Sequence, residues 1–165
     1  MTDGPPPDRA QRLSHLDDEG AARMVDVSGK TATARTATAR ATVHTTADVI
    51  SLIASGGLPK GDALATARIA GILAAKRTSE LIPLCHQIAL SSVDVDFTIT
   101  GTAVELTTSA RTTDRTGVEM EALTAATVAA LTVYDMIKAV DPAARIEDVR
   151  VIRKEGGKSG VWTPA

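Results

Sequence analysis

Residues 117–140 carry ionisable side chains at the two ends of a long apolar run. Glu119 and Glu121 lie near the start, and Asp135 and Lys138 lie near the end, with no charged residue between Glu121 and Asp135. A helix over this run has no face suited to water, so its charged ends are candidates for general acid–base chemistry. A simpler alternative remains open. The glutamates would only complement the helix dipole, and Asp135 with Lys138 would be a surface ion pair.

The spacing of these groups limits how they can act together. Asp135 and Lys138 are at i and i+3, so their side chains can meet on one helix face. Fourteen positions separate Glu121 from Asp135, about 21 Å along a helix that rises about 1.5 Å per residue. One small molecule cannot contact both ends of a single straight helix. We therefore expect that a site using both ends would combine two subunits.

Two basic residues are candidates for binding an anion. Lys60 precedes Asp62, a good helix N-cap, and a lysine at the positive end of a helix has an anion as its natural partner. Arg35 lies among alanines and threonines, where a charge on a strand needs a reason. Ordinary solvent exposure is the alternative for Lys60, and an edge or solvent-facing position is the alternative for Arg35.

The sequence Gly157-Lys-Ser159 superficially resembles a phosphate-binding P-loop. That motif needs a glycine where Ile152 stands and a helix after it, where this sequence ends. The P-loop interpretation therefore fails. A lysine placed near an anion and a flexible tail both remain open for residues 156–160.

Cys85 and His86 could suggest nucleophilic catalysis. Adjacent residues of an extended chain point to opposite sides, so these two do not form a dyad by themselves. The sequence has three histidines, one cysteine and no paired-ligand spacing, so we predict no metal site. His86 is then a candidate for hydrogen bonding or proton transfer, and a buried histidine with satisfied hydrogen bonds is the alternative.

The elements that must position these residues alternate between strands and helices. Strands are predicted over residues 23–27, 31–46, 88–100, 103–113 and 145–154, and helices over residues 48–55, 63–77 and 117–140. A turn at Ser28–Gly29 closes the first strand, and residues 81–86 form a proline-bent loop. This order predicts an α+β fold with a split β-α-β arrangement, in which helices cover one face of a mainly antiparallel sheet.

Composition places the chain in a broad class. Its 165 residues suit a single domain, and its net charge of −2 gives no general attraction to nucleic acid or to anionic membranes. We find no signal peptide and no run that approaches a membrane span in length and apolarity. A single cysteine fits a reducing cytoplasm. These features predict a cytoplasmic globular protein.

The aromatic content is unusually low, at 2%. A core short of bulky side chains must use alanine and threonine with close backbone approach, and association with further copies would add buried surface. RNA and single-stranded DNA are bound largely by stacking on aromatic rings. The composition therefore disfavours a nucleic-acid-binding protein.

Several long motifs occur in order along the chain, and together they carry a resemblance to a known family. They are Met24-Val-Asp-Val-Ser28, Lys60-Gly-Asp62, Ala65-Thr-Ala-Arg-Ile-Ala-Gly71, Ala75-Lys-Arg-Thr78, Leu81-Ile-Pro-Leu-Cys-His86, Thr116-Gly-Val-Glu-Met-Glu-Ala-Leu123, Tyr134-Asp-Met-Ile-Lys138 and Gly156-Gly-Lys-Ser-Gly160. From about His15 to Gly160 the chain resembles the cyclic pyranopterin monophosphate synthase family of molybdenum cofactor biosynthesis. It departs in an N-terminal extension through about Leu13 and in Asp114-Arg115, where lysine is commoner.

The resemblance implies a ferredoxin-like fold and a homohexamer built as a trimer of dimers, with sites at the dimer interface. It implies a lyase that converts 3′,8-cyclo-7,8-dihydro-GTP into cyclic pyranopterin monophosphate with release of pyrophosphate. No resident cofactor or metal is implied, and a Mg²⁺ ion accompanying the triphosphate is left open. Residues 1–13 would be a disordered extension, residues 14–160 the single synthase domain and residues 161–165 a tail.

The resemblance also assigns residues to the site. The catalytic positions are Lys60, Asp135, Lys138 and His86, and the substrate-binding positions are Leu84, Cys85, His86, Glu119, Met120, Glu121, Arg35 and Lys154. Our hypothesis is that Lys60 and Lys138 exchange protons, which suits a lysine of lowered pKa beside a carboxylate. Asp135 would position Lys138, and Glu119 with His86 would hold the base-derived ring. Arg35 and the lysines would carry positive charge toward the leaving pyrophosphate.

A different class of function stays open beside the synthase. The same fold could form a non-catalytic oligomer that binds a purine nucleotide and does no chemistry. The complete set of Lys60, Asp135 and Lys138 favours the enzyme, because a sensor has no need of it.

Overall fold

The computed structural model describes residues 19–158 and 160–164, so the predicted extension of residues 1–13 lies outside it, as do residues 14–18. The described residues form four strands and four helices. In chain order these are β1 (Thr33–His44), α1 (Ala47–Ser55), α2 (Ala63–Ala75), α3 (Thr78–Leu81), β2 (Leu90–Ile99), β3 (Ala103–Asp114), α4 (Glu119–Ile137) and β4 (Arg145–Glu155).

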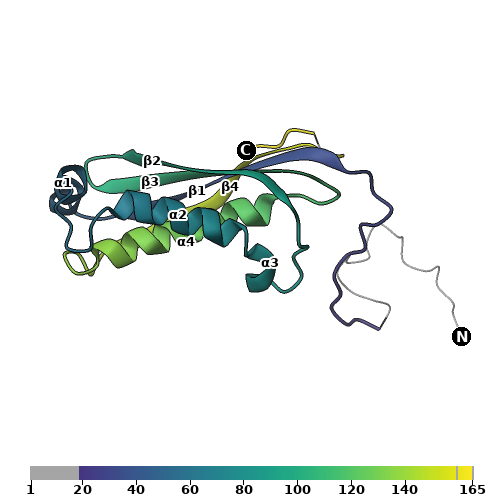
Figure 1. Cartoon of the computed structure of the whole chain (residues 1–165), viewed down its shortest axis with the longest axis horizontal. Coiled ribbons are helices and arrows are strands. Elements are labelled where there is room, and N and C mark those ends of the chain that lie inside the picture. The colour runs from purple at the N-terminus through teal and green to yellow at the C-terminus, as the bar shows by residue number, and fades with distance from the viewer. Residues whose placement is uncertain (1–18, 159, 165) are drawn as a thin grey trace, which may run out of the picture.

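The strands form one antiparallel sheet in the order β2-β3-β1-β4. β2 and β3 are joined as the predicted hairpin, whereas β1 lies inside the sheet between β3 and β4. Helices α2 and α4 lie side by side on one face of this sheet, and α1 caps one end of the molecule (Figure 1). The α+β, ferredoxin-like prediction is confirmed.

Small side chains build the contact between α2 and α4, as the composition predicted. Ala67, Gly71 and Ala74 of α2 are buried, and so are Ala125 and Ala129 of α4. A Cβ added at Gly71 would lie 3.0 Å from the backbone oxygen of Ala125 and 3.2 Å from the Cβ of Ala129. The two helix backbones therefore approach closely because no larger side chain separates them.

The expectation that no run approaches a membrane span in length and apolarity is wrong for helix α4. By length and composition alone it could cross a membrane, with a mean hydropathy of 1.3. It instead packs against β1, β3 and β4 on one side and against α2 on another, as a core helix does. Its apolar middle is therefore explained by burial on two sides within one chain.

One local expectation is wrong, and two further features were not predicted. Residues 23–27 form no strand within the described range, although the turn at Ser28–Gly29 is present. The short helix α3 was not predicted. At its first residue the Thr78 hydroxyl donates to the backbone oxygens of Ala74 and Ala75, at the end of α2. In the segment predicted as a tail, residues 161–165, Trp162 forms a backbone bridge with Lys154 of β4.

Candidate active site

Lys60, Asp135 and Lys138 meet at the C-terminal end of α4, and we call them the lysine–aspartate cluster. The Asp135 carboxylate lies 2.6 Å from Nζ of Lys60 and 2.7 Å from Nζ of Lys138. Lys60 also donates to the backbone oxygen of Asp135 at 3.0 Å. Asp62, whose carboxylate accepts from the Ala65 N–H, caps α2 and fixes the loop that carries Lys60.

The two lysines set the charge state of the cluster. Their hydrogen bonds, first that from Lys138 and then that from Lys60, lower the pKa of Asp135 to about 2. The same hydrogen bond and charge raise the pKa of Lys138 above its ordinary value of 10.5. The expectation that a lysine beside the carboxylate has a lowered pKa is therefore wrong for Lys138 in the isolated chain. A neighbouring negative charge favours the ammonium form.

At the other end of α4 lies a hollow of about 440 Å³, which we call the histidine hollow. Six of the predicted site residues line it: Leu84, Cys85, His86, Glu119, Met120 and Glu121. The proline-bent loop supplies the first three of these and the first turn of α4 supplies the others. The fold thus brings together two motifs that lie far apart along the chain.

His86 is held in one orientation within this hollow. Its Nε2 lies 2.7 Å from the backbone oxygen of Val25. A carbonyl oxygen only accepts, so Nε2 carries the proton and Nδ1 is the nitrogen that can accept one. The Cys85 thiol has a separate contact, with its Sγ 3.9 Å from Oε1 of Glu121. The prediction that Cys85 and His86 form no dyad is confirmed.

Glu121 is a buried carboxyl group with unused hydrogen-bonding capacity. Its residue is 3% exposed, and its Oε2 has no hydrogen-bond partner among the residues that the structure describes. Burial raises its pKa, and the nearby charge of Glu119 adds to this. Burial also raises the pKa of the Cys85 thiol. A glutamate that only complemented the helix dipole would stay in water, so that alternative fails for Glu121.

A second hollow, of about 690 Å³, adjoins the first and shares Lys30, Thr116 and Gly117 with it. Every titratable side chain that lines it is a cation, and we call it the basic hollow. These side chains are Lys30, Arg35, Arg115 and Lys158. Such a concentration of positive charge in a concave surface is suited to a polyanion.

Arg35 and Lys154 line a small hollow of about 30 Å³ that joins the two. It shares Gly117 and Glu119 with the histidine hollow, and Arg35 and Gly117 with the basic hollow. Arg35 donates from Nε to the backbone oxygen of Asp114 at 3.0 Å, which holds its guanidinium at the end of β1. Lys154 Nζ lies 3.2 Å from the carboxylate of Glu119. Because β1 is an inner strand, the alternative of an edge position for Arg35 is wrong.

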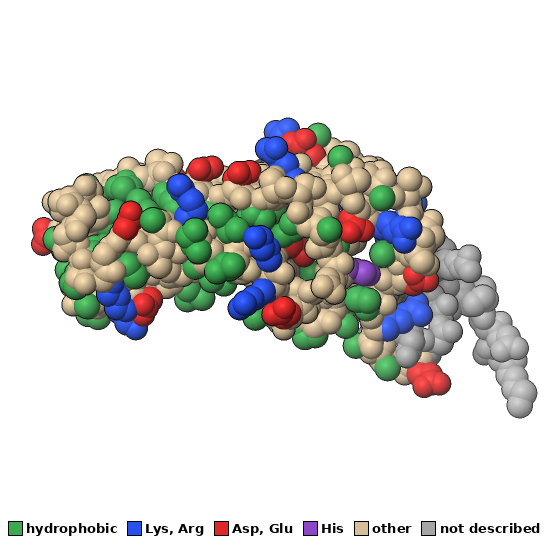
Figure 2. All heavy atoms as spheres, in the orientation of Figure 1, with side chains coloured by type: hydrophobic (Ala, Val, Ile, Leu, Met, Phe, Trp, Pro, Cys, Tyr) green, Lys and Arg blue, Asp and Glu red, His purple; other side chains and the backbone are tan. Residues whose placement is uncertain are grey.

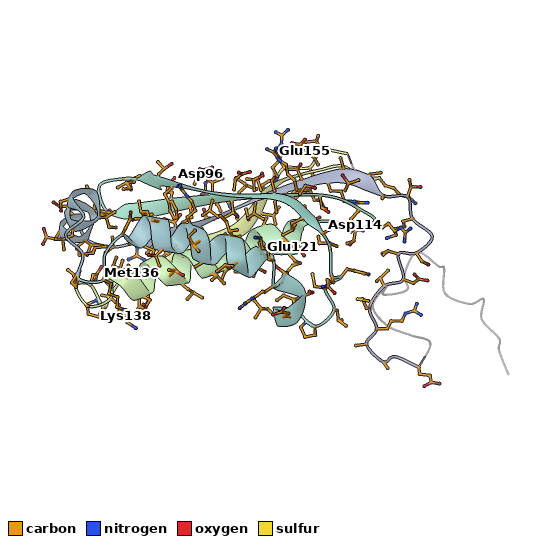
Figure 3. All side chains as sticks on the ribbon, in the orientation of Figure 1. Asp96, Asp114, Glu121, Met136, Lys138 and Glu155 are labelled. Atoms are coloured by element: carbon orange, nitrogen blue, oxygen red, sulfur yellow. The ribbon has the colours of Figure 1, made fainter. Side chains whose placement is uncertain are left out.

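The predicted site residues therefore form two groups at opposite ends of α4. Figure 3 labels Glu121 and Lys138 at these ends, with the helix between them. Lys30, Arg115 and Lys158 line the basic hollow but were not among the predicted site residues. Lys158 had a signal in its glycine-flanked motif, whereas Lys30 had none beyond the turn before it.

No group of three or more His, Cys, Asp or Glu side chains that could hold a metal ion occurs in the described part of the chain. The nearest approach to one, in the histidine hollow, is a thiol of raised pKa beside a buried carboxyl group of raised pKa. Both shifts disfavour the charged forms that bind metals. The absence of a resident metal stays a prediction.

Comparisons with known proteins agree on one family. Residues 24–157 match the model of the MoaC family. The chain is 65% identical to cyclic pyranopterin monophosphate synthase 2 of Mycobacterium tuberculosis (strain ATCC 25618 / H37Rv), over 94% of this chain and 93% of that protein. It is 63% identical to the cyclic pyranopterin monophosphate synthase of Streptomyces coelicolor, over 94% of this chain and 92% of that protein.

Proposed function

The chain belongs to the MoaC family, and from this premise we infer that it is a cyclic pyranopterin monophosphate synthase, a lyase of molybdenum cofactor biosynthesis. It converts 3′,8-cyclo-7,8-dihydro-GTP into cyclic pyranopterin monophosphate and releases pyrophosphate. The structural observation that best supports this function is the pair of adjoining hollows. One is lined by a histidine and carboxyl groups, and the titratable side chains that line the other, among the described residues, are all cations.

The two hollows match the two ends of that substrate. A purine-derived ring presents N–H donors and carbonyl acceptors, which suit Glu119, Glu121 and His86 of the histidine hollow. A triphosphate presents several negative charges, which suit the four cations of the basic hollow. The shared residue Lys30 lies where the two ends of the substrate would join.

Closing the cyclic phosphate is a substitution at phosphorus. A hydroxyl oxygen of the sugar-derived part attacks the α-phosphorus, and the bond from that phosphorus to the bridging oxygen breaks. Pyrophosphate leaves with the electron pair, and the hydroxyl proton passes to a base. Arg35, Lys154 and the basic hollow would stabilise the charge that gathers on the leaving group.

The lysine–aspartate cluster would carry the proton transfers of ring opening and closure. Lys138 is held as an ammonium ion by Asp135, so in the resting chain it is a proton donor. Lys60 shares the same carboxylate and would be the partner that exchanges the proton. His86 would accept through Nδ1 in the other hollow.

Within one chain, Asp135 of the lysine–aspartate cluster lies about 21 Å from Glu121 along α4, because a helix rises about 1.5 Å per residue. We therefore place the complete site between subunits, with the cluster of one chain facing the hollows of another. A homohexamer built as a trimer of dimers provides such interfaces. Figure 2 shows hydrophobic side chains on the surface over α2 and α4, and Ile69, Leu73 and Leu131 are exposed there.

The test is turnover of the cyclised dihydro-GTP by the purified protein, followed as pyrophosphate release and as product by mass spectrometry. Equal amounts of both products are expected, and addition of EDTA reports whether Mg²⁺ on the triphosphate is required. Substrate binding without pyrophosphate release would instead support the purine-nucleotide-binding alternative. The protein is expected to act in the cytoplasm and without a resident cofactor.

A further inference from the structure

The described residues after β4, 156–158 and 160–162, contact both Arg35 and Lys154. After Gly156 the chain turns back, and the Gly156 N–H donates to the backbone oxygen of Gly160 at 3.1 Å. Trp162 then pairs with Lys154 through two backbone hydrogen bonds, each 2.9 Å long. The indole ring lies beside the lysine side chain, with Nζ of Lys154 5.6 Å from the ring centroid.

Two glycines fix the path of this segment against β1. Gly156 and Gly157 have φ angles of +96° and +69°, which L side chains rarely adopt. A Cβ at Gly156 would lie 2.2 Å from the backbone oxygen of Ala34, and one at Gly157 would lie 2.6 Å from Nη1 of Arg35. The segment is therefore seated on the strand that carries Arg35.

We propose that Trp162 is a positioning residue for substrate binding, which holds the Lys154 ammonium group beside Glu119 at the junction of the two hollows. The inference rests on the proposed function, because it takes the triphosphate as the ligand of this junction. A lysine side chain has four rotatable bonds and loses much conformational freedom when it is fixed. An aromatic face restricts it without neutralising its charge, and so leaves it ready for an anion.

Trp162 has no comparable structural role in the described chain. Its residue is 42% exposed, and its ring lies outside the hydrophobic core. Its pairing with Lys154 uses backbone atoms, which remain in any substitution except proline. Replacement of the ring therefore changes the environment of the Lys154 side chain while the sheet is retained.

The kinetic test compares Trp162→Ala, Trp162→Phe and the neighbouring exposed control Val161→Ala with the wild type. We expect Trp162→Ala to raise KM about 2- to 5-fold with kcat nearly unchanged, because a contact to the bound triphosphate supports ground state and transition state alike. Trp162→Phe should recover most of the loss, and Val161→Ala should change neither constant. An unchanged KM in Trp162→Ala, or no recovery by phenylalanine, overturns the proposal.

A binding measurement separates this proposal from the activity itself. Trp162 is the single tryptophan of the chain, so its fluorescence reports on this position alone. Titration with inorganic pyrophosphate should change the emission saturably in the wild type, and Lys154→Met should weaken that binding. If the wild type has no synthase activity but pyrophosphate still perturbs the fluorescence, the proposed function fails while the anion contact stands. Isothermal titration calorimetry extends the comparison to Trp162→Ala, which has no tryptophan left to report. If pyrophosphate binds equally well to wild type and to Trp162→Ala, the positioning role fails.

Discussion

Asp135 accepts hydrogen bonds from two ammonium groups, and its charge determines how both lysines can act. Its carboxylate is ionised at every pH above about 2, since its pKa is lowered to that value. The contribution of these contacts to folding is therefore complete above the ordinary aspartate pKa of 3.8 and is lost as the pH falls toward 2. An acid limb of the activity profile near pH 5 to 6 would thus not come from Asp135.

The first prediction concerns Asp135→Asn. Removal of the negative charge takes away the cause of the raised Lys138 pKa, so that pKa should fall, as seen in a pH titration of the lysine Cε resonance by NMR. Turnover should fall by about 100-fold or more, because the proton donor is no longer held in place.

The matched control for this variant is Glu147→Gln. Glu147 is an exposed carboxylate on β4 that also contacts two basic side chains, Arg145 of β4 and His44 of β1. The Glu147→Gln variant should leave both the titration of Lys138 and the turnover unchanged. A Lys138 pKa that does not move in Asp135→Asn would mean that the ion pair is absent in solution.

The second prediction concerns the buried carboxyl of Glu121. Its folded-state pKa is raised above 4.5, so protonation favours the folded form. The resulting stability is present below pH 4.5 and is lost as the pH rises through the folded-state pKa. Glu121→Gln removes the ionisation, so at pH 7 it should be more stable by about 1 kcal/mol, or about 2 to 4 °C in Tm.

Thermal unfolding at several pH values checks this prediction. The difference between Glu121→Gln and wild type should shrink as the pH is lowered to 4, and turnover of the variant should be reduced at every pH. Glu105→Gln, on the exposed face of β3, should show neither effect. A variant less stable than the wild type at pH 7 would show that the ionised carboxylate is well satisfied in the assembled protein.

At the scale of the elements, the order of strands and helices could be predicted because each has a local signal. Asp62 caps α2, the turn after β2 contains Gly101, and Asp141 with Pro142 follows α4. The features of the fold that could not be predicted depend on contacts between residues that are distant in sequence. The segment at residues 23–27 alternates like a strand, but in the described structure it pairs with no strand. Its contacts are the turn hydrogen bonds of Asp26 and Val27 and the contact of Val25 with His86.

The same distinction applies to the site. The motifs identified the residues of the histidine hollow and of the lysine–aspartate cluster, because their types and spacing are specific. The basic hollow could not be predicted, since Lys30, Arg115 and Lys158 come from three segments that only the folded sheet brings together. The reversed pKa expectation for Lys138 arose because the hydrogen bond and charge of Asp135, which raise a lysine pKa, outweigh the burial that lowers it.

The third prediction concerns the contact between α2 and α4. Gly71→Val places two methyl groups where even a Cβ is within 3.2 Å of Ala129 and of Val95, so the variant should lose about 1 to 3 kcal/mol of stability. Ala65→Val introduces the same side chain at an exposed position of the same helix and should cost less than about 1 kcal/mol. Urea unfolding measures both. Helix propensity alone would make Gly71→Val slightly stabilising, because glycine is the poorer helix former. A Gly71→Val variant that loses no stability would therefore show that the close packing does not set the cost.

At the scale of the whole molecule, the length of α4 determines where a complete site can lie. The helix is packed along its length against the sheet and α2, so it cannot bend to bring its ends together. Lys60 and Asp135 belong to one cluster within a chain, at 2.6 Å. Mixing variants of these two residues would therefore not separate the contributions of different subunits. The informative pair takes one residue from each end of the helix.

The last prediction uses such a pair, Asp135→Ala and His86→Ala. Each variant alone should be nearly inactive, since every site of its oligomer lacks one group. After dissociation and reassembly of an equal mixture, a dimer of the two variants has one site with both defects and one intact site. About a quarter of wild-type activity should then return, because half of the dimers are mixed and each contributes one of its two sites. The same mixing of Asp135→Ala with Lys60→Ala is the control and should restore nothing. Recovery in neither mixture would contradict the shared site, because it would mean that each chain completes its own.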